Sequence, residues 1–428
     1  MKKTSIGLAL LAITGAASAQ SSVTLFGVLD AGVSYYNTKS SYFSPTPAVS
    51  RPTVTISQTV LQGGQTGYVP SRLGFRGQED LGGGLAASFW LEGQMSVNDG
   101  ATPILFSRRS TVSLSNFLGE IRLGRDFTPN FWSDTFYDPF NNWGVGANLI
   151  GSINARLAIA TALPGGGLLN GGLPGGPDNY VHTSNAIGYF MPKGLGGFYG
   201  QLMYAFPEGT KNSLQPNTPS QRAALDAARF GWQSGKFDIS GSYQVSTPID
   251  AVAPFTSTLL DTKLKTASLG SSYDFGVVKV SGELSRATND SDAAIPFAAA
   301  PLRVAIASTS VHYDGALAGF SVPFGASTFK AAYSYVKYSN DVATAYSSNQ
   351  DASASKISIG YTYNLSKRTL LYATAAYVKI RNGQNNSFVM GAPTGNTTPS
   401  FVTTATSTSA GYAPSSSLGY DFGINHAF

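Results

Sequence analysis

Residues 71–97 read SRLGFRGQEDLGGGLAASFWLEGQMSV, and two alternating segments in this stretch surround one tight connection. Leu73, Phe75 and Gly77 fall on one face of the first segment, and the residues between them are polar or small. A period of two is typical of a β-strand with two different faces. The glycine-rich connection Leu81–Gly84 is short enough to join two antiparallel strands. The stretch therefore predicts a β-hairpin.

The same pattern recurs along the whole chain. Segments of roughly 10 residues alternate apolar with small or polar residues, which is the length of a strand that crosses a bilayer in a tilted sheet. We expect sixteen strands, at Val23–Tyr36, Val69–Asp80, Leu85–Val97, Leu105–Asn116, Gly119–Arg125, Val181–Phe190, Phe198–Phe206, Arg222–Gln233, Lys236–Thr247, Thr262–Phe275, Val277–Thr288, Arg303–Asp314, Thr328–Ser339, Ser355–Tyr363, Thr369–Ile380 and Pro414–Phe428.

The connections between these segments alternate between short and long. Hydrocarbon offers no partner to an unpaired backbone N–H or C=O, so a sheet can span a membrane only if it closes on itself. The sequence predicts an all-β fold, a 16-stranded antiparallel transmembrane β-barrel, with residues 20–428 as one domain. The long polar connections are expected at 37–67, 126–179, 207–221, 248–261, 288–302, 339–355 and 381–413.

The first nineteen residues have the layout of a secretory signal peptide. Lys2 and Lys3 precede an apolar run at Ile6–Ile13, and Ala17-Ser18-Ala19 is typical of a cleavage site. We therefore expect residues 1–19 to be removed on export.

Composition narrows the function classes. Charged residues are 12% of the chain, about half of the ~25% usual in soluble domains, and a lipid-facing belt would account for the deficit. The net charge of +5 is mild, and no run of lysine and arginine suggests nucleic acid as a partner. Cysteine is absent, which excludes disulfides and thiol chemistry.

The chain ends on an alternating segment. Leu418, Tyr420, Phe422 and Ile424 share one face, and Phe428 is the last residue. A barrel closes when its last strand pairs with its first. We therefore assign barrel closure and assembly to Phe428.

Five stretches of the chain carry a resemblance to known proteins: SVTLFGVLDAGV (22–33), SRLGFRGQEDLGGGL (71–85), LGRDFTP (123–129), YNLSKRTLLY (363–372) and FGINHAF (422–428). Together they resemble the general trimeric porins of Gram-negative bacteria, most closely the β-proteobacterial porins. The resemblance implies a sixteen-stranded barrel, a homotrimer, and a third external loop folded into the lumen as a constriction. It also implies passive diffusion of small hydrophilic solutes and ions across the outer membrane.

Two arginines are expected on the lumen face of the second strand. Arg72 and Arg76 lie on the face opposite Leu73 and Phe75, and a charge that faces lipid at mid-membrane costs about 2–4 kcal/mol. The resemblance places an arginine of the constriction at Arg72. It leaves Arg76 either in the constriction or in the periplasmic vestibule.

The pair Arg108-Arg109 leaves two alternatives open. The family match places Arg108 in the lumen, whereas alternation with Val112 and Leu114 places Arg109 there. We expect one of the two arginines to join the constriction and the other to face outward, toward the rim or a subunit interface.

The acidic side of the constriction is expected in the long segment 126–179. In the family, acidic residues of this part of the third loop face the arginines, which here indicates Asp134 and Asp138. The chain departs from its enterobacterial relatives because Asp138-Pro-Phe140 stands where they carry Pro-Glu-Phe-Gly-Gly. Asp30 lies opposite Leu25 and Leu29, so we expect it to face the lumen.

An outer-membrane enzyme is the rival class. Catalysis of that kind needs a base beside a nucleophile, and His182, His312 and His426 show no such partner pattern. We expect no enzyme activity, no metal site and no cofactor. A substrate-selective channel with a saturable binding site remains the alternative to a general porin. Lipopolysaccharide, outer-membrane lipid and the outer-membrane assembly machinery are the expected partners besides solutes.

Overall fold

The computed structural model describes residues 22–44, 50–64, 67–100, 105–159, 179–209, 220–252, 259–296, 303–340, 351–386 and 410–428. The expected signal peptide at 1–19 lies outside these residues. The strands within them form one antiparallel sheet of seventeen strands. Among the described residues, no helix is both long and apolar enough to cross a membrane.

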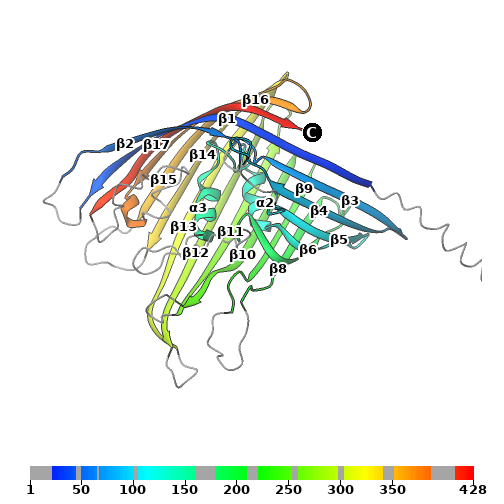
Figure 1. Cartoon of the computed structure of the whole chain (residues 1–428), viewed down its shortest axis with the longest axis horizontal. Coiled ribbons are helices and arrows are strands. Elements are labelled where there is room, and N and C mark those ends of the chain that lie inside the picture. The colour runs from blue at the N-terminus through cyan, green and yellow to red at the C-terminus, as the bar shows by residue number, and fades with distance from the viewer. Residues whose placement is uncertain are drawn as a thin grey trace, which may run out of the picture.

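Strand length differs between the two halves of the sheet (Figure 1). The strands near the N-terminus are short, apart from the first, and those of the C-terminal half are longer. The strands are β1 (Ser22–Phe43), β2 (Val54–Gln62), β3 (Arg72–Gly82), β4 (Leu85–Gln94), β5 (Arg109–Asn116), β6 (Gly119–Phe127), β7 (His182–Phe190), β8 (Phe198–Ala205), β9 (Leu225–Ser234), β10 (Phe237–Val252), β11 (Leu259–Asp274), β12 (Lys279–Pro296), β13 (Arg303–Phe324), β14 (Ser327–Asn340), β15 (Ala352–Asn364), β16 (Thr369–Arg381) and β17 (Gly411–Ala427).

The sheet closes into a barrel. Each strand from β3 to β17 pairs with the next, and β17 returns to pair with β1. The other edge of β1 pairs with β3 along Ser22–Val28 and with β2 along Gly32–Ser40. Since β2 and β3 share one position beside β1, the barrel has sixteen positions, which confirms the expected fold.

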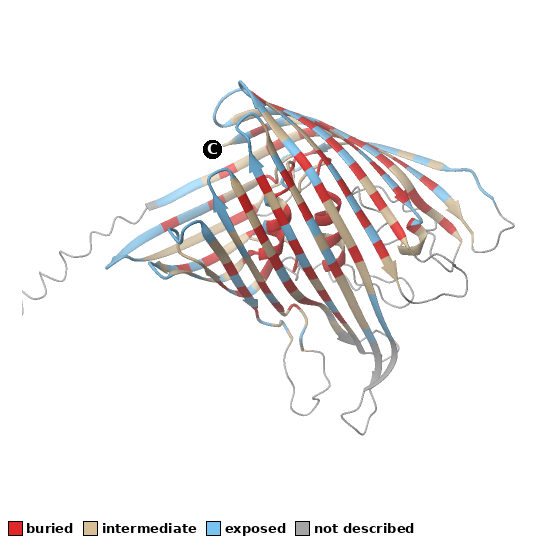
Figure 2. Cartoon of the chain, turned by 180° about the vertical axis from the view of Figure 1, so that it is seen from behind, coloured by how far each residue is buried: buried red, intermediate tan, exposed pale blue. Residues whose placement is uncertain are grey.

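Burial alternates along the strands of the barrel (Figure 2), and the two faces of the sheet differ in chemistry. In β15, Lys356 and Ser358 are buried, whereas Ile357 and Ile359 are about half exposed. Large apolar side chains are exposed in the same way on strands all around the barrel. An apolar face exposed on a closed sheet is the one that lipid covers. We call it the apolar face, and the opposite one the polar face.

The expected short turns are confirmed, but several strands reach further than predicted. Gly82, Gly83 and Gly84 all adopt positive φ in the turn between β3 and β4, a conformation that glycine reaches without strain. The segment 37–67, expected as a connection, contains the end of β1 and all of β2. Beyond the lipid an outward side chain need not be apolar, and in β2 the exposed residues include Thr55, Ser57 and Thr59 while backbone pairing with β1 continues.

Two helices follow β6. The first is α2 (Pro129–Phe136), capped by Thr128, whose hydroxyl accepts from Phe131 N–H at 3.2 Å. Proline at the first helical position suits a helix start, because its missing N–H would have no partner there. The second is α3 (Leu149–Ile159), and a short 3₁₀ turn η1 (Gly383–Asn386) follows β16.

Both helices contact the polar face of the sheet. α2 lies against β8–β11 and α3 against β12–β15. The Tyr137 ring packs directly on Gly270 of β11, where any side chain would overlap it. Ile150 occupies the corresponding place above Gly315 of β13. Glycine on the polar face therefore makes room for the large side chains of this segment.

Candidate functional site

Glu92 of β4 holds two arginines. Arg108 Nε donates to Glu92 Oε1 at 2.7 Å, and Arg72 Nε lies 3.6 Å from the same oxygen. The Trp90 indole donates to Oε2 at 3.1 Å, so both carboxylate oxygens are engaged. The side chains of Arg108 and Glu92 are 5% and 7% exposed, and that of Arg72 is 26% exposed. Arg72 is therefore the member of this group that meets water.

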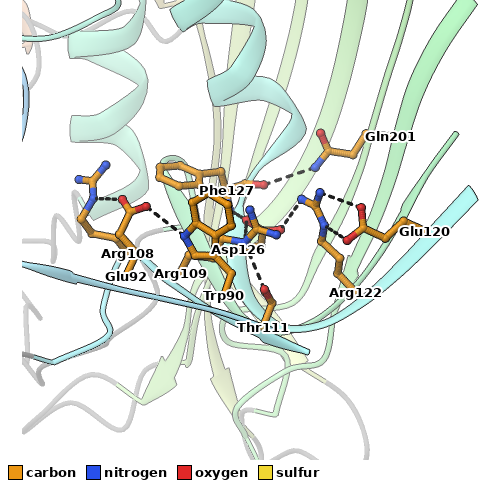
Figure 3. A network of polar contacts seen from close by, with 10 residues as sticks. All are labelled: Trp90, Glu92, Arg108, Arg109, Thr111, Glu120, Arg122, Asp126, Phe127 and Gln201. Atoms are coloured by element: carbon orange, nitrogen blue, oxygen red, sulfur yellow. Dashed lines mark hydrogen bonds and ion pairs between the residues drawn. The ribbon is translucent and has the colours of Figure 1, made fainter. Parts of the chain in front are cut away.

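Asp126 of β6 forms a second group with two further arginines (Figure 3). Its carboxylate lies 3.5 Å from Arg109 Nε and 3.1 Å from an Arg122 terminal nitrogen. Arg122 also binds Glu120 through two hydrogen bonds of 2.7 and 2.9 Å, a two-point pairing that fixes the guanidinium plane.

Trp90 connects the two groups. The Arg109 guanidinium lies 4.6 Å from the Trp90 ring centroid, and the Arg76 guanidinium lies 5.2 Å from it. Arg76 also lies over Phe26, at 5.4 Å. Arg76 is exposed, and among the described residues it has no carboxylate within ion-pair distance. An aromatic face can hold a guanidinium while leaving its N–H groups free for another acceptor.

Positive charge exceeds negative charge in this part of the polar face, which we call the arginine strip. A hollow of about 380 Å³ in the strip is lined by hydroxyl groups and by three of its arginines. An uncompensated charge in a low-dielectric wall raises the local concentration of the opposite ion. The strip consists of the basic Arg72, Arg76, Arg108, Arg109 and Arg122 and the acidic Glu92, Glu120 and Asp126.

Both arginines of the 108–109 pair reach the strip, whereas the sequence pattern expected only one. Arg109 is the first residue of β5 and pairs in register with Glu92, so alternation places it on the polar face. Arg108 precedes the strand, where alternation no longer applies, and its backbone N–H bonds Glu92 C=O at 3.1 Å.

Asp134 and Asp138 lie away from the strip, which differs from the expectation that they face it. Asp134 is completely buried, and its Oδ2 accepts from the Tyr180 hydroxyl at 2.6 Å and from Asn154 at 3.1 Å. Asp138 is 2% exposed and accepts from backbone N–H groups of its own segment, including that of Phe140 at 2.9 Å. Burial raises the pKa of both carboxyl groups above the ordinary value. The two aspartates organise the fold of the segment.

Asp134 also faces a second carboxyl group. Its carboxyl group interacts with the carboxyl group of Glu283 in β12. Asp134 Oδ1 and both Glu283 oxygens find no N–H or O–H donor in the described structure. Two carboxyl groups in this position need one shared proton.

Asp30 and Phe428 take part in the closure of the barrel. Asp30 lies on the polar face, as expected, but is completely buried. Its carboxylate accepts from Tyr372 O–H at 3.0 Å and from Asn425 at 3.1 Å, which joins β1 to β16 and β17. Phe428 N–H and C=O each bond Gly27 at 3.1 Å. The last residue therefore completes the ladder between the last strand and the first.

Four members of the strip, Arg122, Glu92, Glu120 and Asp126, were not expected from the sequence, and neither was Trp90 beside them. A register argument could have found Glu92, because it faces Arg109 directly across the β4–β5 pair. Among the described residues, no cluster of three or more His, Asp or Glu side chains could hold a metal ion.

Comparison with known proteins identifies relatives along nearly the whole chain. A family model described as Gram-negative porin matches residues 7–383. Outer membrane porin protein 32 of Delftia acidovorans is 34% identical over 381 residues, 89% of this chain and 90% of that protein. An outer membrane porin protein of Bordetella pertussis is 30% identical over 405 residues, 89% of this chain and 94% of that protein. The solved anion-selective porin from Comamonas acidovorans superposes with a TM-score of 0.67 at 29% identity, covering 96% of this chain and 100% of that one.

Proposed function

Because the chain belongs to the Gram-negative porin family and forms an outer-membrane channel, we propose that it passes small hydrophilic solutes and favours anions. The observation that carries the anion preference is the arginine strip, where five arginines stand beside three carboxylates. Asp134 and Asp138, which could have balanced that charge, are buried. The related porin of known structure is described as anion-selective, which is consistent with this proposal.

In this proposal the segment Thr128–Ile159 lies in the lumen and narrows the channel. Its helices contact the polar face of β8–β15. The ring of Trp143, between the two helices, lies 5.8 Å from the guanidinium of Arg108 in the arginine strip, so the segment also contacts the strip. Solutes would then pass between the segment and Arg72. A wall of fixed positive charge at a narrow point attracts anions and repels cations.

The assembly state and partners belong to the same proposal. We infer a homotrimer embedded among outer-membrane lipid and lipopolysaccharide, inserted by the outer-membrane assembly machinery through its last strand. The chain acts as a passive channel in this scheme and has no catalytic role. The strongest alternative is a substrate-selective channel with a saturable site.

Ion selectivity tests the proposal directly. Reversal potentials of the purified channel in a salt gradient should show anion preference. Replacing Arg72 and Arg108 together by alanine should shift the preference toward cations and raise conductance, since charge and bulk are both lost. The shift should shrink at high salt, where screening shortens the reach of each charge. Solute flux that rises linearly with concentration separates the general porin from the saturable channel.

Two control variants sharpen this test. Arg286→Ala removes an exposed arginine that is bound to Asp314 outside the strip and should leave selectivity unchanged. Asp134→Asn with Asp138→Asn should also leave selectivity nearly unchanged, because both carboxyl groups are buried. A cation-selective wild type, or a strip variant indistinguishable from it, contradicts the proposal.

A further inference from the structure

The wall of the barrel is interrupted at its second position, between β2 and β3. Neither strand pairs with the part of β1 around Asp30. The Ser71 hydroxyl replaces the missing ladder there: it accepts from Asp30 N–H at 2.9 Å and donates to Asp30 C=O at 3.2 Å. Ser71 N–H also bonds Gly64 C=O at 3.0 Å, which closes the base of a small excursion.

The described part of this excursion, Gly67–Ser71, is directed to the polar face. Gly67 leaves no room for a side chain beside the buried Asp30 carboxylate, and Tyr68 N–H donates to that carboxylate at 3.1 Å. The Tyr68 ring then stacks on Tyr372 of β16, with centroids 4.7 Å apart and planes at 19°. The excursion therefore projects into the barrel.

Tyr68 reaches as far as β14. Lys330 Nζ donates to the Tyr68 hydroxyl at 2.9 Å and lies 5.2 Å from the ring centroid. Both side chains keep partial exposure, and no carboxylate of the described residues pairs with Lys330. The hydrogen-bond partner of Lys330 is a neutral hydroxyl, so no carboxylate of the described residues offsets the positive charge of this lysine on the polar face.

The excursion also adjoins both parts of the proposed channel. Arg72, the water-facing arginine of the strip, donates to Pro70 C=O at 3.2 Å. On the other side, the excursion lies against Gly144 of the segment Thr128–Ile159. A Cβ added to Gly144 would lie only 3.0 Å from the carbonyl oxygen of Gly67. The excursion thus contacts both the arginine strip and the segment Thr128–Ile159.

We propose that Gly67–Ser71 is a second constriction element, and that Tyr68 and Lys330 contact passing solutes and set size and anion preference at this level. The inference rests on the proposed channel function and adds a cationic site opposite the arginine strip. Tyr68 supplies bulk and holds the ammonium in place, and Lys330 supplies the charge. The solutes concerned are small inorganic and carboxylate anions.

The absence of cysteine from the chain permits a clean test. Lys330→Cys is made in the full chain, assembled into channels, and then treated with thiosulfonate reagents of either charge while single-channel current is recorded. We expect a negatively charged adduct to lower conductance and shift the reversal potential toward cations. A positively charged adduct should lower conductance and retain anion preference. Modification of a channel that already conducts separates this effect from a folding defect.

Lys39→Cys is the matched control. Lys39 is an exposed lysine of β1, and its reaction with the same reagents should leave the current unchanged. A thiol at position 330 that does not react from water, or that reacts without changing conductance, overturns the inference. Loss of anion preference in the untreated wild-type channel would instead contradict the proposed function.

Tyr68 provides a second, independent readout. Tyr68→Ala should give a conductance clearly above that of wild type, because a ring is lost from the constriction. The increase should be severalfold smaller than the increase that removal of a whole loop would cause. Tyr68→Phe keeps the ring and loses only the bond to Lys330, so conductance should stay near wild type. Equal conductance of Tyr68→Ala and wild type would show that Tyr68 does not line the passage.

Discussion

At the scale of single residues, Glu92 is the carboxylate that offsets positive charge at Arg72 and Arg108 of the arginine strip. It binds Arg72 and Arg108 with one oxygen and Trp90 with the other. Glu92→Gln should shift the reversal potential toward anions, because two arginines lose their counter-charge. It should also lower the thermal stability, since a hydrogen bond to a charged group contributes about 1.5–3 kcal/mol.

The control for this prediction is Glu79→Gln. Glu79 is exposed in β3 near the turn and forms no ion pair among the described residues, so its removal should change neither selectivity nor stability. Reversal potential and thermal unfolding of the assembled channel measure both effects. A Glu92→Gln channel with wild-type selectivity would show that this carboxylate does not balance the strip.

Single residues also show where sequence reasoning succeeded and where it ended. Arg72 and Arg76 were predicted correctly on the polar face because alternation within a strand fixes the face of each residue. Alternation could not place Arg108, which precedes β5, or Asp134, which lies in a helix between strands. The burial of such residues depends on which strands their segment packs against. Those strands lie far away in sequence, so local alternation cannot predict the contact.

At the scale of elements, glycines on the polar face fit α2 and its following residues to the wall. Gly270→Val would drive a side chain into the Tyr137 ring and should displace the segment. We expect altered conductance and noisier current, with the barrel still assembled because the ladder is unaffected. Gly241→Val is the matched control, since the nearest atom to its added Cβ is 3.6 Å away. Identical currents from the two variants would contradict this arrangement.

The contact between Asp134 of α2 and Glu283 of β12 makes the attachment of α2 depend on pH. Burial raises the pKa of Asp134, so the folded segment binds the shared proton more tightly than an unfolded chain would. The stabilisation is therefore complete below the ordinary value of about pH 4 and is lost as pH rises through the raised pKa. Tyr180 and Asp138 are the other titratable groups near the pair.

Current noise should accordingly increase with pH in the wild type and not in Glu283→Gln. The amide of the glutamine donates to Asp134 Oδ1 without needing a proton, so the attachment no longer titrates. Glu120→Gln, which alters a carboxylate of the arginine strip, should retain the wild-type dependence. Parallel pH profiles for wild type and Glu283→Gln would exclude the shared proton as the cause.

Strand count and turns were predictable from local pattern, but strand ends and the interruption at β2 were not. Lipid enforces apolar outward residues only within its own thickness, so the sequence carries a clear signal only for that part of each strand. Val54–Gln62 pairs with β1 and alternates valine and isoleucine with threonine and serine, which is a strand signal, although the sequence prediction placed it in the connection 37–67.

At the scale of the whole molecule, closure depends on the last residue. Deleting Phe428 removes two ladder bonds to Gly27 and a ring that fills the space above this glycine. We expect much less heat-resistant trimer from this deletion than from removal of several residues within 381–413. Gel mobility of unheated samples measures the difference. Equal trimer yields would show that closure does not require the terminal residue.

The bond between Gly27 and Phe428 also has a kinetic consequence. It joins two residues about 400 positions apart in sequence, so a nascent chain cannot form it before Phe428 has been synthesised. Bringing together ends separated by about 400 residues costs about 5 kcal/mol of chain entropy, and folds dominated by such distant pairings form slowly. Before closure the sheet has free edges, and the apolar side chains that will face lipid have no lipid to cover them, which favours aggregation. The yield of folded channel then depends on how fast the chain is delivered to the membrane, rather than on the stability of the closed barrel.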